Sequence, residues 1–75
     1  MEEIELDEKI AELGRRISKL RLQRGLTVEK LAYESGISKG NLSDIENGKK
    51  NPRFTTLLLI AYGLDLEISK LLKIL

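Results

Sequence analysis

The 75-residue sequence predicts an all-α domain of five helices, and three observations carry that prediction. Apolar residues recur at steps of three and four along most of the chain, which is the period of a helix with one buried face. No stretch alternates between apolar and polar residues over a useful length, so no strand is expected. Glycines and capping residues interrupt the helical pattern, which leaves connections of about two to six residues, as in helix bundles.

Composition limits both the stability and the chemistry of the chain. Seventy-five residues form one small domain, near the lower size limit for a single hydrophobic core. The sequence contains no Cys and no His, which excludes disulfides, thiolate metal sites and the usual general base. We therefore expect no metal, no other cofactor and no enzyme activity. No uncharged apolar run is long enough for a membrane span, and the acidic N-terminus is unlike a signal peptide, which favours a cytoplasmic protein.

The net charge of +1 hides an uneven distribution of charged residues. Residues 1–12 contain six acids and one base, whereas the rest of the chain contains twelve bases and six acids. A basic body favours a polyanionic partner, although many solvated surfaces are equally charged.

The first two helices follow from apolar spacing and capping signals. One apolar stripe predicts the first helix: Leu6, Ile10, Leu13, Ile17 and Leu20. Gly25 suits the position after a helix C-terminus, and Thr27 suits the N-cap of the next helix. A second helix is expected from about Val28 to Ser35, with Leu31 and Ala32 facing inward.

Gly36 ends the second helix, and Ser38 can cap a third helix that runs to about Asn47. The polar stretch NGKKNP that follows is a loop by composition. Apolar spacing predicts a fourth helix that begins at Phe54, from Phe54, Leu57, Leu58, Ala61 and Leu64. Its core stripe is expected to be Leu57, Ala61 and Leu64. A fifth is expected from Leu66 to Leu75, with four apolar residues on one side: Ile68, Leu71, Leu72 and Leu75.

The second and third helices form a distinct unit at about residues 28–47. A three-residue turn built on Gly36 joins them, which is the spacing of a helix-turn-helix. Small Ala32 allows the two helices to approach closely. The third helix has only Leu42 and Ile45 as apolar anchors, so its other side is left exposed. A helix anchored on one side in this way can enter the major groove of DNA, which is wide enough to admit it.

Four motifs occur in a characteristic order, LRLQRGLT, SGIS, LSDIENGKKNP and GLDLEISKLL. With this order and spacing, the sequence from about Leu13 to Leu72 resembles the phage repressor/Cro-type helix-turn-helix family, the xenobiotic-response-element class of bacterial transcriptional regulators. The resemblance implies a compact five-helix, lambda-repressor-like DNA-binding domain. Residues 1–75 would then be a single domain with an acidic leader at residues 1–8, and the C-terminal helices at about 54–75 would serve dimerisation.

The resemblance also implies which residues meet the bases of double-stranded DNA. The positions at the groove are Ser38, Lys39, Gly40, Asn41, Ser43 and Asp44. Lys39 could donate to guanine, and Asp44 could accept from cytosine N4 or could instead be a solvent-facing charge that repels DNA. Gly40 offers no side chain and costs about 1 kcal/mol relative to Ala inside a helix. It could permit close approach of the backbone, or it could mark a helix that tightens only on DNA.

A second group of residues is implied to lie along the DNA backbone. These residues are Thr27, Lys49, Lys50, Asn51 and Arg53, with Arg53 near the minor groove. Such contacts position a protein without selecting sequence. The alternative for Lys49 and Lys50 is an ordinary solvated loop. Val28 departs from the family, where a Gln at this position commonly helps to bind phosphate.

Two further groups come from comparing the sequence with this family, the first as a match and the second as a departure, since the positions of Leu59 and Tyr62 are often charged in the family. Arg21 and Glu46 match a pair that bridges the first helix and the end of the third. Their spacing alone shows only two surface charges, whereas a buried pair, which we expect, would hold the third helix in place. Outward apolar residues in the C-terminal third predict a homodimer interface or, alternatively, scattered surface hydrophobes: Leu59, Tyr62, Ile74 and Leu75.

The expected function is sequence-specific DNA binding by a transcriptional regulator. The chain would be a bacterial or phage-encoded repressor or controller protein that binds a palindromic operator as a homodimer. The alternative is an antitoxin-like interaction module whose main role is to neutralise a toxin or another protein partner.

Overall fold

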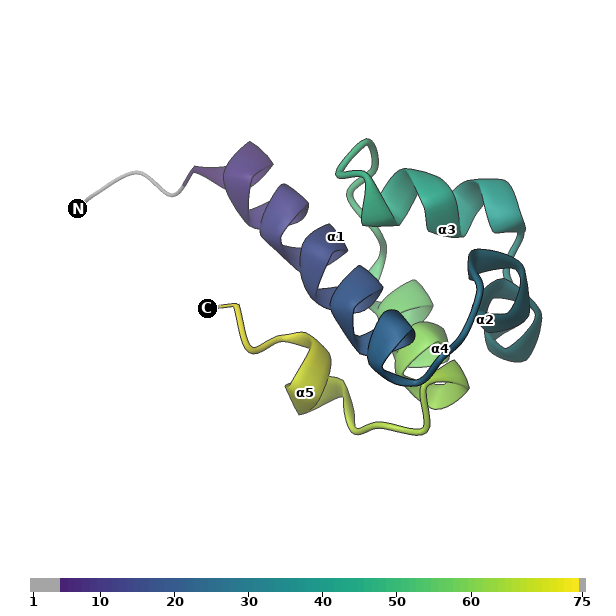
Figure 1. The fold of residues 1–75 in the computed structure, drawn as a ribbon. Helices are drawn as coiled ribbons and strands as arrows, with labels where there is room; N and C mark the ends of the chain where they lie inside the picture. Colours follow the sequence, from purple (N-terminus) through teal and green to yellow (C-terminus); the bar gives the residue numbers. More distant parts are fainter. Residues whose placement is uncertain (1–4, 75) are drawn as a thin grey trace.

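The computed structural model describes residues 5–74, and this part of the chain is all-helical (Figure 1). Its five helices confirm the predicted fold class. They are α1 (Leu6–Gln23), α2 (Val28–Ser35), α3 (Lys39–Glu46), α4 (Phe54–Gly63) and α5 (Ile68–Leu71). α1 begins inside the segment 1–8, so the last three residues of that acidic segment are helical.

The helix boundaries follow from the capping residues that the sequence supplies. The Thr27 hydroxyl accepts a hydrogen bond from the backbone N–H of Lys30 at 3.0 Å, and the Ser38 hydroxyl accepts one from Asn41 N–H at 3.0 Å. Each cap satisfies one of the backbone donors that a helix N-terminus leaves without a partner.

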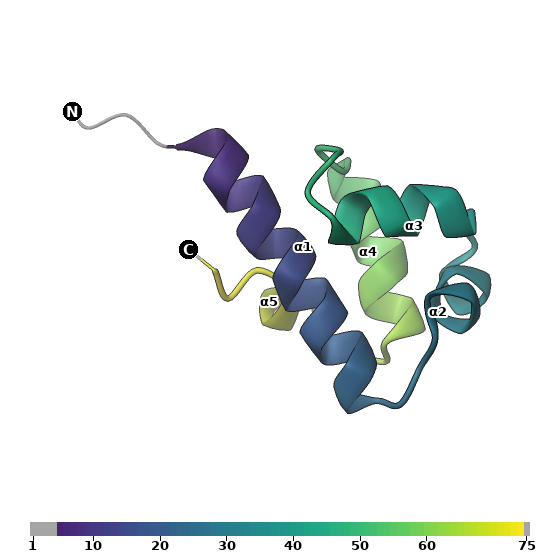
Figure 2. The same cartoon turned by 45° about the horizontal axis from the view of Figure 1, so that its top comes forward.

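The helices pack around one core, with α1 crossing α3 and α5, and α2 against α3 and α4 (Figures 1 and 2). Leu and Ile side chains dominate this core, as the composition requires. The side chains below 2% exposure are Ile17, Leu31, Leu42, Ile45, Ile60, Leu64 and Leu71.

The predicted core stripe of α4 is confirmed, and the structure adds Ile60 to it. Leu57, Ala61 and Leu64 are buried as expected, together with Ile60, whereas Phe54 and Leu58 are 59% and 42% exposed. α4 carries apolar residues on every side, so their spacing fits more than one buried face. The packing of α4 against α2 decides between them.

The predicted fifth helix is also too long. α5 ends at Leu71, and the chain then turns back beside α1. The Lys9 ammonium donates to the Ile74 carbonyl at 3.1 Å, and Leu72 and Ile74 pack against the core from this turn. Leu75 lies outside the described residues. At the other end of the chain, Leu6 is 66% exposed and does not join the core as its spacing predicted.

None of the helices in residues 5–74 has the length and apolar content that crossing a membrane requires.

Candidate nucleic-acid interface

The turn between α2 and α3 is tight because Gly36 adopts a left-handed conformation, with φ of 70°. Its N–H donates to Tyr33 O at 3.2 Å, and the N–H of Ile37 donates to Ala32 O at 3.0 Å. These bonds satisfy the last carbonyls of α2 and reverse the chain within three residues. Ala32 is buried beneath the turn, and Ile37 packs against the core.

α3 is buried on one side and exposed on the other. Leu42 and Ile45 fix its inner side and are at most 1% exposed. The residues predicted to contact bases all lie on its other side or at its start: Ser38, Lys39 and Gly40 are exposed, and Asn41, Ser43 and Asp44 are half-buried. α3 therefore presents a polar side to solvent while its apolar side is fixed against the core.

A mostly buried ion pair holds the C-terminal end of α3. Arg21 Nε lies 2.8 Å from Glu46 Oε2, and Arg21 Nη2 donates to Glu46 Oε1 at 3.1 Å. The two side chains are only 12% and 7% exposed, so the pair is not the surface contact that its spacing alone allowed. This arrangement supports a structural role in orienting α3.

Gly14 permits the close crossing of α1 and α3. A Cβ at this position would meet the backbone carbonyl oxygens of Ile45 and Glu46, the latter at 2.6 Å. Any larger residue would push α3 away from α1. Gly14 was not among the predicted site residues, because a glycine inside an apolar helix pattern gives no sign of what it touches.

The loop after α3 presents a line of basic and polar side chains. Lys49, Lys50, Asn51 and Arg53 are all exposed. Lys50 Nζ donates to Asn41 Oδ1 at 3.3 Å and lies 3.9 Å from Asp44 Oδ2. Asp44 thus has a cation beside it, which offsets the repulsion that an isolated carboxylate would exert on DNA.

Two residues at the start of α2 border the same surface. Thr27 caps α2, and its exposed position leaves the positive end of the helix dipole open to an anion. Val28 instead packs against the core, which gives an apolar residue a role at this position. Glu29 Oε1 lies 3.3 Å from Lys39 Nζ across the turn. This contact was not predicted from the sequence, since the ten-residue separation becomes close only after the turn forms.

Within residues 5–74, no cluster of three or more acidic side chains is arranged to hold a metal ion. The surface formed by α3, the N-terminus of α2 and the basic loop consists of hydrogen-bonding and charged groups. Such a set matches the chemistry of base edges and phosphates.

Comparison with known proteins identifies relatives along most of the chain. The Helix-turn-helix family model matches residues 17–71. The immunity repressor protein of Bacillus phage phi105 is 37% identical over 57 residues, covering 76% of this chain and 40% of the phage protein. The HTH-type transcriptional regulator SutR of Escherichia coli (strain K12) is 39% identical over 57 residues, covering 76% of this chain and 32% of SutR. The chain therefore spans less than half the length of these two relatives.

Comparison with solved structures also identifies relatives, which share the fold of this chain. The structure of the restriction-modification controller protein C.AhdI from Aeromonas hydrophila matches with a TM-score of 0.81 and 32% identity, covering 83% of this chain and 94% of C.AhdI. The clp gene regulator ClgR from Corynebacterium glutamicum matches with a TM-score of 0.82 and 28% identity, covering 87% of this chain and 84% of ClgR. With the family model matching across the central helices, this chain belongs to the helix-turn-helix family.

Proposed function

We propose that this chain is a sequence-specific, double-stranded DNA-binding transcriptional regulator of the cytoplasm, a repressor or controller protein rather than an enzyme. The observation that carries the proposal is the position of α3, which is anchored by Leu42, Ile45 and the Arg21–Glu46 pair while its polar side stays open. The relatives named as an immunity repressor and a restriction-modification controller support the same function.

α3 enters the major groove in this proposal. Lys39 donates to guanine O6 and N7 from the first turn, and Ser38, Asn41 and Ser43 offer hydrogen-bonding groups to neighbouring bases. A Cβ on Gly40 would point into open space, so the backbone of α3 can approach the base edges there. Asp44 accepts from a cytosine amino group, with Lys50 beside it reducing its repulsion of the phosphates.

The DNA backbone is contacted from two sides of α3. Thr27 and the N-terminus of α2 bind one phosphate, and the loop residues bind the next phosphates along the groove: Lys49, Lys50, Asn51 and Arg53. These contacts supply affinity that depends on salt and not on sequence.

A homodimer on a palindromic operator completes the proposal. Phe54, Leu58 and Tyr62 recur at steps of four on the exposed side of α4, with Leu59 beside them. Four large exposed apolar side chains on one ten-residue helix favour an interface over scattered hydrophobes. A two-fold contact here would set two α3 helices about 34 Å apart, one turn of DNA. Ile74, which was also predicted at the interface, is half-buried and packs against the core, and its carbonyl accepts a hydrogen bond from Lys9 of α1.

An antitoxin-like interaction module remains the second candidate, because the exposed apolar face of α4 would also suit a protein partner. Fluorescence anisotropy with labelled duplex DNA and the purified chain alone separates the two functions. The proposal predicts binding that competitor duplexes of unrelated sequence displace poorly. Absence of DNA binding, together with a stoichiometric protein that co-purifies, would favour the antitoxin-like function instead.

A further inference from the structure

The outer side of α1 carries charges in an order that neither the core nor the proposed DNA surface explains. Glu8, Glu12, Arg15 and Lys19 follow at steps of four, three and four, so they form one stripe along the helix, here called the α1 charge stripe. Its N-terminal half is acidic and its C-terminal half is basic. The stripe lies on the side of α1 opposite the buried residues, which are Leu13, Gly14, Ile17 and Leu20.

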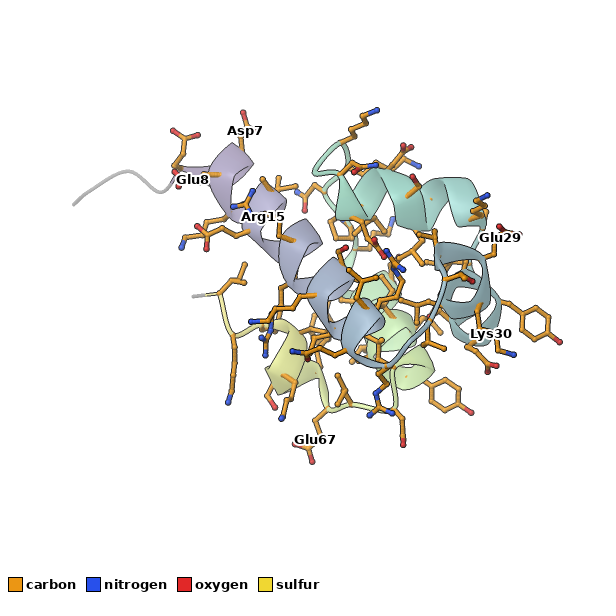
Figure 3. The ribbon with its side chains drawn as sticks, in the orientation of Figure 1. Asp7, Glu8, Arg15, Glu29, Lys30 and Glu67 are labelled. Carbon is orange, nitrogen blue, oxygen red and sulfur yellow. The ribbon has the colours of Figure 1, made fainter. Side chains whose placement is uncertain are left out.

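The stripe is open to solvent. Glu8, Arg15 and Lys19 are exposed, and Glu12 is half-buried. Figure 3 labels Glu8 and Arg15 along α1, on the opposite side of the molecule from Glu29 and Lys30 of α2. Arg15 and Lys19 also line shallow depressions on both sides of the stripe, one reaching Asn47 and the other reaching Lys73.

Within a single chain, each half of the stripe sets like charges side by side, and only Glu12 and Arg15 in its middle are opposite charges at i and i+3. Glu8 and Glu12 are like charges at i and i+4, and so are Arg15 and Lys19, a spacing that destabilises an isolated helix. Among residues 5–74, the ion pair between Lys9 and Glu12 at 3.5 Å is the only one that involves the stripe. The helix dipole favours acids in the first turn and bases in the last, but its effect does not reach Glu12 and Arg15 in the middle of an 18-residue helix.

A second copy of the same helix gives every charge of the stripe an opposite partner if it runs antiparallel. With a two-fold axis between positions 12 and 15, Glu8 faces Lys19 of the second copy and Glu12 faces Arg15 of the second copy. Symmetry repeats both contacts, so all eight charges are paired. A parallel arrangement would instead set like charges against each other. Glu8 and Lys19 of one helix are about 16 Å apart along the axis, so they cannot pair with each other.

We infer that the α1 charge stripe is a docking surface for α1 of a second copy of this chain in antiparallel orientation. The stripe and the exposed apolar side of α4 lie on different helices, so one copy can use both. Two different two-fold contacts on one chain join dimers into larger assemblies. Exposed ion pairs are individually weak and salt-sensitive, so this contact links dimers only where they are already concentrated. The inference does not depend on DNA binding.

Charge reversal tests the inference on the full chain without DNA. Sedimentation equilibrium at about 50 mM salt should show an association step that disappears at about 1 M salt, where the screening length falls to about 3 Å. Glu8→Lys alone and Lys19→Glu alone each set like charges against each other and should weaken this step on the order of tenfold. The double variant E8K/K19E should restore it, and so should an equimolar mixture of the two single variants.

Lys70→Glu is the matched control, since it makes the same charge change at an exposed base on α5 outside the stripe. It should leave the association step unchanged, and circular dichroism should show native helicity in every variant. The inference is overturned if the wild type shows no salt-sensitive step, or if neither the double variant nor the mixture associates better than the single variants. A defect of Lys19→Glu that no Glu8 change rescues would also overturn it, and would assign the basic half to an acidic partner of another kind.

Discussion

The guanidinium of Arg21 and the carboxylate of Glu46 form a two-point ion pair that joins α1 to the last residue of α3. Arg21 Nη1 also donates to the carbonyl of Leu26 at 2.7 Å, so one side chain ties together α1, α3 and the connection that leads into α2. A planar guanidinium with several donors suits this role, whereas a lysine could not make all three contacts in the same geometry. The orientation of α3 therefore depends on a contact outside the helix-turn-helix itself.

Removing Arg21 should be costly because it leaves a buried carboxylate without its partner. Arg21→Met is expected to lower the free energy of unfolding by about 3–5 kcal/mol. Replacing both partners, Arg21→Met with Glu46→Leu, should recover most of that loss because no buried charge then remains. Urea denaturation of the wild type, both single variants and the double variant measures the coupling. A loss below about 1 kcal/mol in Arg21→Met would mean that the pair behaves as a surface contact.

Two glycines in different surroundings should respond oppositely to the same substitution. Gly14→Ala would place a methyl group against the Glu46 carbonyl oxygen, so it should destabilise the fold by about 1–3 kcal/mol. Gly40→Ala meets open space and improves helix propensity, so it should stabilise the free protein by up to about 1 kcal/mol. Thermal unfolding of the two variants provides the comparison. Equal effects would contradict the close crossing of α1 and α3.

The order of the helices and their N-caps could be predicted from the sequence, because Thr27, Gly36 and Ser38 act locally. The core stripe of α4 was also predicted, but the burial of Ile60 beside it was not, since apolar residues surround the helix and only the packing partner selects one side. The end of α5 was missed for a similar reason: the contact between Lys9 and Ile74 joins residues 65 positions apart.

The predicted site shows the same division between local and distant effects. The amphipathic pattern of α3 correctly placed Leu42 and Ile45 inward, which leaves the predicted base-contacting residues on the other side. The separation of Arg21 and Glu46 in the sequence does not by itself predict that the pair is buried, because burial depends on how α1 crosses α3. The sequence also did not predict the contact between Lys50 and Asn41, because this contact forms only when the loop folds back on α3.

Lys50 should contribute to the salt dependence of DNA binding without affecting base preference. Each neutralised phosphate adds about −0.9 to the slope of log K against log salt. Lys50→Ala should therefore flatten the slope by about one unit per protomer, as measured by anisotropy over a range of salt concentrations. Lys70→Ala, which removes an exposed base on α5, should leave the slope unchanged. If Lys50→Ala also leaves it unchanged, Lys50 is only a solvated loop residue.

The exposed side of α4 should be required for the homodimer. Leu59→Glu combined with Tyr62→Glu places acidic side chains from both copies in a two-fold interface and should yield a folded monomer with much weaker operator binding. Tyr33→Glu is the control, because Tyr33 has the same 79% exposure as Tyr62 but lies on α2. Sedimentation velocity distinguishes the states. A dimer that persists in the double variant would place the interface elsewhere, with the segment that contains Ile4 and Leu6 as the next candidate.

Selection of bound sequences from a random double-stranded DNA pool tests the central claim, that α3 contacts bases as part of a dimer. The wild type should enrich a palindrome whose half-sites are about 10 base pairs apart from centre to centre. Lys39→Ala should enrich the same palindrome with preference relaxed at one base pair per half-site, and should lose about 1–3 kcal/mol of binding to it. Enrichment of no sequence by the wild type, or an equal loss by Lys39→Ala on selected and random DNA, would contradict the proposed role of α3.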